Sequence, residues 1–358
     1  MQFTIINTCG TSVLTNPARG DKDLYDALTQ YSNERDEKKI PSDVYEKIQN
    51  HWNTLINQWS KKEEMAAKLA SAELNCLITW QRKNKIDNKD CFCYLVHTDT
   101  VFGSLAAQIV EEWLNVNKYQ GVIVQKIDSL NTGTIEDFER GLANLVEWAF
   151  KLKNNDTKSK FIFNTAGGFK SVSGFTQTIG TFLADETIYK FEGGDEVLEI
   201  PKLPIVWSEI DSIRQNLDDY HKISLGILLS SYSHLNTLWV KNGEFSPWGR
   251  LAWENAKQIL YTEEVLPFVY SNVTEGTEFR SSVKGLDKKR IKQINERIDD
   301  LCLYSIRGTD KNRLDYKKLK GNHPYSYECD AWADGGAKRL FCNEKDGKII
   351  VEKLDKHL

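Results

Sequence analysis

The residues best suited to chemistry lie in the segment 161–170 (FIFNTAGGFK), where a short apolar run leads into small and polar residues. Gly167 and Gly168 would let backbone N–H groups approach a ligand, because glycine has no Cβ in the way. Residues 171–183 have apolar side chains at helical spacing, so the glycines would precede a helix N-terminus, where unpaired N–H groups attract anions. Lys170 adds a cation. The segment predicts a phosphate or nucleotide site, although it matches neither the Walker A nor the GxGxxG motif.

Four runs of apolar or β-branched residues predict the strands that position this site, and stretches with helical periodicity separate them. This alternation is typical of a parallel sheet in an α/β protein, so we expect a Rossmann-like domain. A polar loop follows each run, and in open α/β sheets ligands bind at the edge where such loops lie. The predicted strands are residues 2–6, 91–96, 121–127 and 161–163, and their loops are residues 7–12, 97–100, 128–133 and 164–168.

Helical segments connect these strands. Residues 21–88 are rich in Lys, Glu, Gln, Ala and Trp, and they predict an inserted helical hairpin that serves packing or a dimer contact. Residues 103–117 and 135–152 predict the crossover helices, with Thr134 or Asn131 as the N-cap of the second.

The composition changes after residue 204. Residues 208–233 and 248–263 predict two helices, joined by a Gly-centred hairpin, and this pattern fits either a small winged-helix module or a simple connector. Residues 285–303 predict an amphipathic helix. An α+β arrangement follows, because three strands are expected beyond that helix, at residues 325–329, 338–343 and 348–354.

The bulk properties are those of a globular protein. The chain has 358 residues, of which 40% are hydrophobic and 27% charged, so it is long enough for two or three domains. We expect a cytoplasmic protein without membrane partners, because the sequence shows neither a signal-peptide pattern nor an apolar run of about 20 residues. The seven cysteines are scattered, which predicts buried thiols and neither a disulfide framework nor a metal site. No cofactor is expected.

The net charge of −4 is unevenly distributed. Residues 265–358 contain 19 lysines and arginines against 15 acidic residues, whereas the rest of the chain is acidic. A basic segment attracts nucleic acid, so the C-terminal part is the better candidate for contact with it.

Residues 1 to about 200 resemble the CARF domain family, the CRISPR-associated Rossmann-fold sensors of cyclic oligoadenylate. The resemblance rests on the first strand with residues 7–12 (NTCGTS) and on residues 164–170 (NTAGGFK). It implies a homodimer whose two equivalent pockets form one site for a two-fold symmetric ring, with cyclic tetra-adenylate preferred to cyclic hexa-adenylate. An isologous dimer suits such a ligand, because the two symmetry axes can coincide.

The resemblance also implies which residues bind the ring. Lys170 and the glycine amides would bind phosphates, residues of the first loop would donate hydroxyl groups, and residues after the second strand would contact a ribose or base. Some family members cleave their ring, and Ser12 with Lys170 is the pair to test for that activity. The expected binding residues are Thr11, Ser12, His97, Thr98, Asn164, Thr165, Gly167, Gly168 and Lys170.

Residues 275–358 are similar to the RelE/YoeB family of ribosome-dependent mRNA interferases, small toxins with two helices packed on an antiparallel sheet. The similarity rests on four segments, of which the first matches the family's helix and the last its catalytic C-terminus. These segments are residues 287–299 (DKKRIKQINERID), 317–321 (KKLKG), 338–341 (KRLF) and 355–358 (DKHL).

This resemblance implies a metal-independent RNA cleavage in which the 2′-hydroxyl attacks the adjacent phosphate. Arg339 would hold the scissile phosphate through its planar fork. His357 would protonate the leaving 5′-oxygen, and Lys317 or Lys318 would either activate the hydroxyl or bind phosphate. Further contacts to RNA are expected from Arg313, Lys320 and Lys338.

Structural interpretations of the same residues remain open. A run of lysines is often a solvated face, Arg339 could form a structural ion pair, and His357 could belong to a frayed terminus. The chain also lacks the aromatic residue that often ends the family's sequences, for which His323, Tyr325 or Trp332 could substitute.

Together these features predict a cyclic-oligoadenylate-activated, ribosome-dependent mRNA endoribonuclease of type III CRISPR defence, whose partners are the ring, the ribosome and mRNA. Residues 1–203 would be the sensor, residues 204–264 a winged-helix-like linker, and residues 265–358 the ribonuclease.

Two alternatives follow from the middle segment. Arg214 and His221 have the Arg-x6-His spacing of HEPN ribonucleases, although this spacing is common by chance. A CARF transcription regulator would instead bind DNA through residues 208–263, but residues 248–260 offer only Arg250 and Lys257 as basic contacts.

Overall fold

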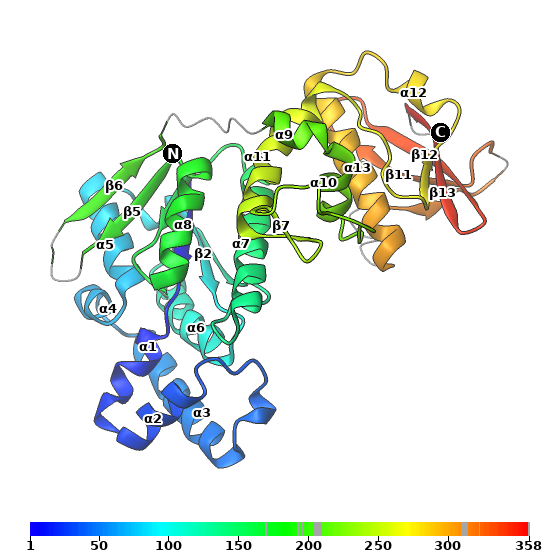
Figure 1. The fold of residues 1–358 in the computed structure, drawn as a ribbon. Helices are drawn as coiled ribbons and strands as arrows, with labels where there is room; N and C mark the ends of the chain where they lie inside the picture. Colours follow the sequence, from blue (N-terminus) through cyan, green and yellow to red (C-terminus); the bar gives the residue numbers. More distant parts are fainter. Residues whose placement is uncertain are drawn as a thin grey trace. The chain divides into compact units, whose positions relative to one another are not determined.

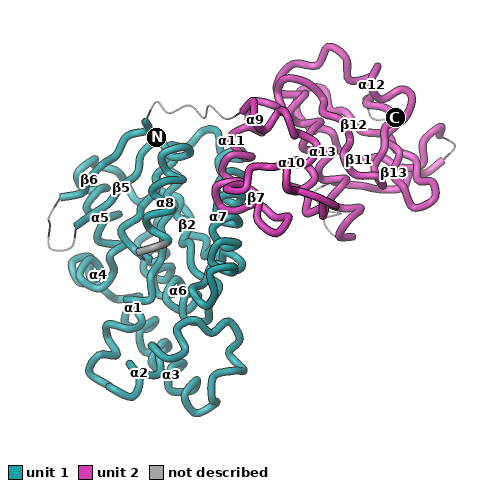
Figure 2. The backbone as a smooth tube through the Cα atoms, in the orientation of Figure 1, with its two compact units in different colours: residues 1–206 teal, residues 207–358 magenta. Residues whose placement is uncertain are grey.

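The computed structural model describes residues 1–168, 170–191, 194, 196–203, 210–308, 314–321 and 323–356, without the side chains of Lys170 and Ser171. The chain forms two compact units, Met1–Val206 and Trp207–Leu358 (Figure 2). The segment 204–264, expected as a linker, therefore falls almost entirely within the second unit, where it has a hydrophobic cluster of its own.

Unit 1 is a doubly wound α/β domain built on one six-stranded sheet (Figure 1). The strand order is β3-β2-β1-β4-β5-β6, and all neighbours are parallel except β5 and β6. The expected α/β fold is thus confirmed. The strands are β1 Phe3–Thr8, β2 Cys91–His97, β3 Gly121–Lys126, β4 Lys160–Asn164, β5 Glu186–Lys190 and β6 Val197–Pro201.

The four predicted strands are confirmed, whereas β5 and β6 were not predicted. Every residue of β1 (FTIINT) is buried. A strand buried on both faces has no alternation of apolar and exposed polar residues. β6 is an edge strand whose residues are mostly half-buried or exposed, and Leu198 is 45% exposed. A short strand with one solvated side has no continuous apolar run, which is why the sequence pattern did not reveal it.

Helices cover both faces of this sheet (Figure 1). The crossover helices begin at threonine N-caps: the Thr100 hydroxyl accepts from the Gly103 N–H, and the Thr134 hydroxyl accepts from the Asp137 N–H. Of the two caps proposed for the second helix, Thr134 is therefore the one used. The helices around the sheet are α6 Val101–Val116, α7 Ile135–Asn155 and α8 Lys170–Leu183.

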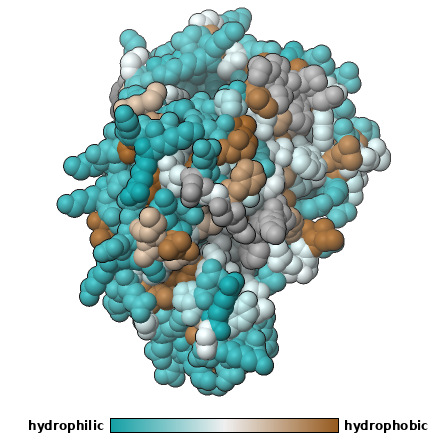
Figure 3. Space-filling model, turned by 90° about the vertical axis from the view of Figure 1, so that its left-hand side faces the viewer, coloured by the Kyte–Doolittle hydropathy of each residue, from teal (hydrophilic) through white to brown (hydrophobic). Residues whose placement is uncertain are grey.

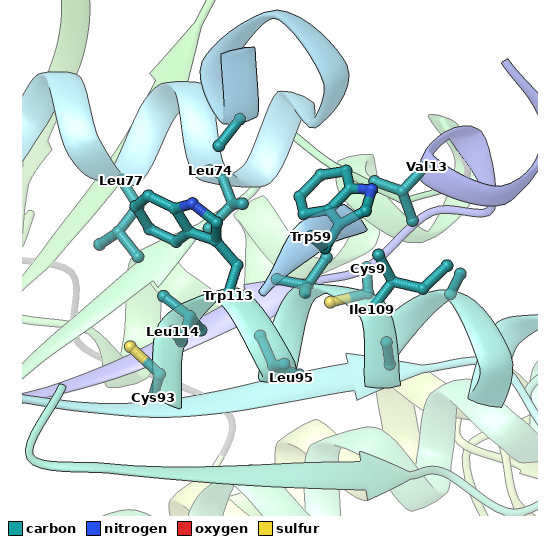
Figure 4. Close-up of a cluster of buried hydrophobic side chains, with 14 of the residues drawn as sticks. Cys9, Val13, Trp59, Leu74, Leu77, Cys93, Leu95, Ile109, Trp113 and Leu114 are labelled. Carbon is teal, nitrogen blue, oxygen red and sulfur yellow. The ribbon is translucent and has the colours of Figure 1, made fainter. Parts of the chain in front are cut away.

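The insertion between β1 and β2 contains four longer helices and not a two-helix hairpin. Figure 4 shows Trp59, Leu74 and Leu77 from these helices packed against α6, which in turn covers Leu95 on β2. The packing role expected for the insertion is thus observed. The helices of this region are α1 Ser12–Thr15, α2 Lys22–Gln30, α3 Ser42–Trp59, α4 Glu64–Ala70 and α5 Ala72–Asn84, with 3-10 turns at Pro17–Gly20, Glu37–Lys39 and Asn88–Asp90.

Unit 2 begins with a small helical region. The prediction of one helix over 208–233 is wrong, because the chain forms α9 Ile210–Gln215 and α10 Leu217–Ser224, and Gly226 then adopts φ +77. A left-handed glycine is a common helix stop. The predicted hairpin is present as β7 Val240–Lys241 and β8 Glu244–Phe245, and α11 Pro247–Glu263 follows it.

The rest of unit 2 is a five-stranded sheet with the order β10-β11-β12-β13-β9, antiparallel except between β13 and β9. The buried side of α13 shares a hydrophobic cluster with Cys329, Leu340 and Val351 of the sheet. The elements are β9 Val273–Glu275, α12 Phe279–Ser282, α13 Lys288–Arg307, β10 Lys317–Lys318, β11 Tyr327–Trp332, β12 Lys338–Lys345 and β13 Lys348–Lys356.

The cysteines are buried and the surface in Figure 3 is largely polar, as the composition of a globular protein without disulfides indicates. All seven cysteines are buried and carry free thiols, as predicted. The face drawn in Figure 3 is mostly hydrophilic, with apolar residues scattered over it. Within the described part of the chain, no helix combines the length and apolarity that a membrane span requires.

A buried polar network connects the helical region of unit 2 to α13. Asp299 of α13 accepts hydrogen bonds from the Tyr261 hydroxyl at 2.7 Å and from Lys257 Nζ at 3.2 Å, and His221 Nε2 lies 2.7 Å from its other oxygen. Burial opposes ionisation of Asp299, but Lys257 and His221 outweigh it and hold the pKa of this carboxyl well below its ordinary value. The network fixes α10 and α11 against α13.

Replacing this carboxylate should destabilise unit 2. Asp299→Asn leaves the half-buried Lys257 without its nearest counterion, so we expect a loss of about 1–3 kcal/mol. Because the folded-state pKa is lowered, the contribution of Asp299 is fully present above its ordinary pKa and disappears as the pH falls below it. Hydrogen exchange of α13 peptides should show faster exchange in the variant. Asp211→Asn, at an 86% exposed side chain, is the control and should change exchange little; equal exchange in both variants would contradict this interpretation.

Candidate functional site

The carboxyl ends of β1 and β4 approach each other closely at the point where the strand order reverses. The Thr8 hydroxyl donates to Gly167 O at 2.7 Å and to Asn164 O at 3.3 Å. A Cβ on Gly167 would lie under 3.0 Å from Thr8 O, and Gly168 adopts φ +88. Both positions therefore require glycine, for space at the first and for backbone conformation at the second.

A pair of buried asparagines holds the two strand ends together. Asn164 Nδ2 donates to Asn7 Oδ1 and to the main-chain oxygen of Glu73, both at 2.8 Å. Asn164 and Thr165 are fully buried, and the Thr165 N–H donates to Ile188 O. We predicted ligand contacts for Asn164 and Thr165, but the structure gives both a positioning role, because neither side chain reaches the surface.

The groups left at this edge are backbone and hydroxyl groups. Thr11 and Ser12 are half-buried, and the Thr11 side chain makes no capping hydrogen bond. A Cβ on Gly10 would lie 3.0 Å from the Gly168 N, so the two loops are in direct contact. Lys170 begins α8, and its side chain lies outside the described residues. The glycine-containing loops, the hydroxyl groups and the N-terminus of α8 lie at the same edge of the sheet. Backbone N–H groups, hydroxyls and helix N-termini are groups that bind anions.

His97 and Thr98, the residues expected to contact a ribose or base, are buried at 3% and 4% exposure. The Thr98 hydroxyl shares a hydrogen bond with the Thr100 hydroxyl at 2.9 Å, and His97 Nδ1 lies 2.8 Å from Thr98 O. Burial lowers the pKa of His97. In this structure neither side chain is presented to a ligand, because both are used in the turn that starts α6.

The neighbouring Asp99 was missed by sequence reasoning. It pairs with Arg35 of the insertion and with Lys126 Nζ at 3.3 Å, and it accepts from the Ser129 N–H. Burial opposes its ionisation, but the Ser129 N–H and the Lys126 ammonium outweigh burial and lower the pKa of Asp99. Arg35 lies 64 positions away, so no local pattern in the sequence could have revealed this pair.

A second charged cluster lies on the sheet of unit 2, and it brings together two of the predicted catalytic residues. Arg339 Nη1 lies 2.9 Å from Asp315 Oδ2, Lys317 Nζ lies 2.7 Å from the same oxygen, and Arg339 also pairs with Asp330. Arg339 thus forms the ion pair that the structural interpretation expects. The same geometry places two cations on either side of one carboxylate oxygen.

Lys318 does not share this position. Side chains alternate along a strand, so Lys317 and Lys318 of β10 point to opposite faces of the sheet, and only Lys317 lies opposite Glu328 on the face of Arg339. Lys320 is exposed just after β10, and Lys338 is half-buried at the start of β12. The predicted residues Arg313 and His357 lie outside the described residues.

The charge state of this cluster limits its chemistry. The hydrogen bond to Asp315 raises the pKa of Lys317, whereas Lys317 and then Arg339 lower the pKa of Asp315. Lys317 is therefore a protonated cation at neutral pH and a poor general base. Of the two roles considered for it, phosphate binding agrees better with this environment.

The residues proposed to replace a terminal aromatic differ in availability. Trp332 is 6% exposed, its indole N–H donates to Gly336 O, and Arg290 lies 4.5 Å from the centre of its ring. Tyr325 stacks on Phe341 at 5.3 Å, and His323 is exposed. Trp332 is thus committed to the fold, and the other two are closer to solvent.

The residues of the two alternative functions are engaged within the protein. His221 is buried against Asp299, whereas Arg214 pairs with Glu263. Arg214 and His221 thus have different partners in the described structure, and they do not form a joint site within one chain. Lys257 is bound to Asp299, and Arg250 lies over the Phe245 ring beside Glu254. The basic residues available to a DNA-reading helix α11 are therefore already used inside unit 2.

These observations define unit 1 as a Rossmann-like domain with an anion-suited edge at its topological switch point. Residues 68–203 match the model of a family described as CRISPR-associated protein (Cas_APE2256). The match covers most of unit 1, from the end of the insertion to the last strand, and it supports an association with CRISPR. Among the described residues, no group of three or more His, Cys, Asp and Glu side chains could hold a metal ion.

The contact between the strand ends can be tested with a pair of glycine variants. Gly167→Ala forces a methyl group into Thr8 O and should lower the stability of unit 1 by about 1–3 kcal/mol, a typical cost of overpacking. Gly174→Ala, at an exposed position of α8 with open space around the new Cβ, should be neutral or stabilising by about 0.5–1 kcal/mol. Urea unfolding measures the stability of both variants. An unchanged free energy of unfolding in Gly167→Ala would show that unit 1 does not depend on the close contact between the two loops.

The cluster on unit 2 can be tested through Asp315. Asp315→Asn removes the charge that competes with an anion for Lys317 and Arg339, and asparagine tolerates the φ of +47 at this position. We expect a short RNA to bind about five- to tenfold more tightly. This corresponds to the loss of ~1 kcal/mol of attraction between the Asp315 carboxylate and the two cations. Fluorescence anisotropy at low salt measures this, with Asp346→Asn in the exposed β12–β13 turn as control. Unchanged affinity in Asp315→Asn would mean that the cations do not bind RNA.

Proposed function

We propose that this protein is a ribonuclease of type III CRISPR defence that a cyclic oligoadenylate, preferably tetra-adenylate, activates. Unit 1 is the CARF-type sensor, and residues 265–358 of unit 2 are a RelE-like mRNA interferase that cuts on the ribosome. The match of residues 68–203 to a CRISPR-associated family supports the first part. The arrangement of Lys317 and Arg339 on an antiparallel sheet supports the second.

The sensor binds its ring at the edge formed by the loops after β1 and β4. The Thr11 and Ser12 hydroxyls, the backbone at Gly167 and Gly168, and the start of α8 contact the phosphates. Two copies of the chain, related by a two-fold axis, supply two such edges to one symmetric ring. Cleavage of the ring by Ser12 with Lys170 is a secondary activity of the same site.

The ribonuclease acts on the phosphodiester that follows an attacking ribose. The 2′-oxygen forms a bond to phosphorus and loses its proton to water, while the bond to the 5′-oxygen breaks and that oxygen gains a proton from the acid. The Arg339 guanidinium and the Lys317 ammonium neutralise the charge that develops on the phosphate oxygens. His357 is the proposed acid, and the products are a 2′,3′-cyclic phosphate and a free 5′-hydroxyl.

Ring binding can control cutting only if the ring prefers one quaternary state of the protein. The buried network of Asp299, His221 and Lys257 couples the helical region after residue 209 to α13, the long helix of the ribonuclease part. A displacement of that helical region would therefore move α13 and the sheet packed on it. This gives the linker segment a role in transmitting the state of the sensor.

One observation carries the proposed cutting activity: Lys317 and Arg339, 22 positions apart, meet at one carboxylate oxygen of Asp315. With ribosomes, mRNA and cyclic tetra-adenylate, the wild-type protein should cut within translated codons. Arg339→Ala should lower the cutting rate at least 100-fold, the effect of removing one preorganised electrostatic group, and leave ring binding intact.

The neighbouring lysines provide a matched pair for the same assay. Lys317→Ala should lower the cutting rate strongly, whereas Lys318→Ala should have a much smaller effect because its side chain leaves the opposite face of the sheet. Equal loss in both variants would contradict this geometry. Equal cutting of free RNA, abolished by Arg214→Ala, would favour a HEPN ribonuclease, and sequence-specific DNA binding without any cutting would favour a transcription regulator.

A further inference from the structure

Glu73 is a buried carboxylate directly behind the loops of the proposed ring site. It is 1% exposed, and it lies on the first turn of α5, after the N-cap Ser71. One carboxylate oxygen would lie 2.9 Å from a Cβ placed on Gly167. Neither carboxylate oxygen has a hydrogen bond of ordinary geometry to any residue within the described ranges.

The environment of Glu73 disfavours its charge. Burial raises its pKa, and the nearby Ser71 hydroxyl and Gly10 N–H offset this only in part. The main-chain oxygen of the same residue accepts from Asn164, so the position of Glu73 is fixed to the end of β4. This contact holds the backbone of Glu73 beside the loops, and the buried side chain places its carboxylate next to Gly167.

An anion at the neighbouring edge would meet this negative charge across a poorly hydrated loop. Two like charges in such surroundings repel more strongly than in water, and a buried carboxyl responds by binding a proton. A protonated carboxyl also gains a donor, which an ionised one lacks. A Glu73 carboxylate that stayed ionised would therefore oppose the binding of phosphates at this edge.

We propose that Glu73 takes up one proton when an anionic ligand binds to the loops at Gly10, Gly167 and Gly168. The proton comes from the solvent, and the carboxylate becomes a neutral carboxyl group while the ligand keeps its phosphodiester charges. Glu73 is a positioning residue that makes ligand affinity depend on pH. This inference rests on the proposed ring site.

The described residues around Glu73 supply no other group that would titrate in its place. Cys9 on β1 is buried, and burial together with the charge of Glu73 raises its pKa well above the ordinary value. Cys93 on β2 and Cys76 on α5 are likewise buried with raised pKa values. The residues of the β4 loop at 164–168 carry no ionisable side chain.

The sign of the effect follows from linkage. Ligand binding raises the pKa of Glu73, so affinity is greatest below the pKa of the free protein and falls by up to tenfold per pH unit above it. It becomes constant again above the pKa of the complex. A role limited to packing would instead lower affinity in a variant by the same factor at every pH.

The test is isothermal titration calorimetry of the full chain with cyclic tetra-adenylate between pH 6 and 9, in buffers of different ionisation enthalpy. The wild type and Glu63→Gln, an exposed glutamate ten residues earlier, should take up a proton on binding and lose affinity as the pH rises. Glu73→Gln should take up no proton when the ring binds, and its affinity should not change with pH. At pH 9 it should bind the ring more tightly than the wild type does.

Absence of proton uptake in the wild type would overturn the inference even if Glu73→Gln failed to fold. Parallel pH profiles for the wild type and Glu73→Gln would overturn it as well, because the proton would then belong to another group. Failure of rings of three, four and six adenylates to bind at any pH would instead overturn the proposed function, and this inference with it.

Discussion

The close approach of the β1 and β4 ends is the constraint on which unit 1 depends. Gly167 fits against Thr8 O only without a side chain, and Gly168 takes a backbone conformation that glycine adopts without strain. The Thr8 hydroxyl and the Asn164 amide then fix both loops to each other and to α5. Because the strand order reverses between these strands, the same contact lies at the edge where open α/β sheets bind their ligands.

The sequence predicted the α/β class and the four central strands, because buried parallel strands read as continuous apolar runs. It did not predict β5, in which only Thr187 and Ile188 are buried, or β6, whose residues are mostly half-buried or exposed, or the end of α10 before Gly226. It proposed residues 7–12 and 164–168 as the site loops, which the structure brings into contact, yet it assigned ligand contacts to Asn164, Thr165, His97 and Thr98, which are buried. Burial depends on packing between distant segments, and local composition does not determine it.

The pairs that define both sites are long-range. Asn164 meets Glu73, Asp99 meets Arg35, and Arg339 meets Asp315. A single sequence gives no distance between such residues, so only the resemblance to a known family linked Arg339 with Lys317, and the structure shows that both side chains contact Asp315. The alternation of side chains along β10 then separates Lys317 from Lys318, a distinction available from the sequence once the strand is known.

The two proposed anion sites share one feature, a carboxylate of the protein where a phosphate would bind. In unit 1, Glu73 is buried, neither of its carboxylate oxygens has a hydrogen-bond partner among the described residues, and its pKa is raised, so a proton can neutralise it when an anion binds. In unit 2, Asp315 is half-exposed and its pKa is lowered, so a phosphate must displace it from Lys317 and Arg339. At both places the binding of an anion would depend on the charge state or the displacement of a carboxylate of the protein.

The central claim is that a ring bound by unit 1 controls cutting by unit 2. The most direct measurement is the rate of mRNA cleavage by the full chain on ribosomes as cyclic rings of three, four and six adenylates are titrated separately. The account predicts a low rate without a ring and a saturable increase with one ring size, at the concentration where that ring binds. A cleavage rate that is the same with and without every ring would contradict it.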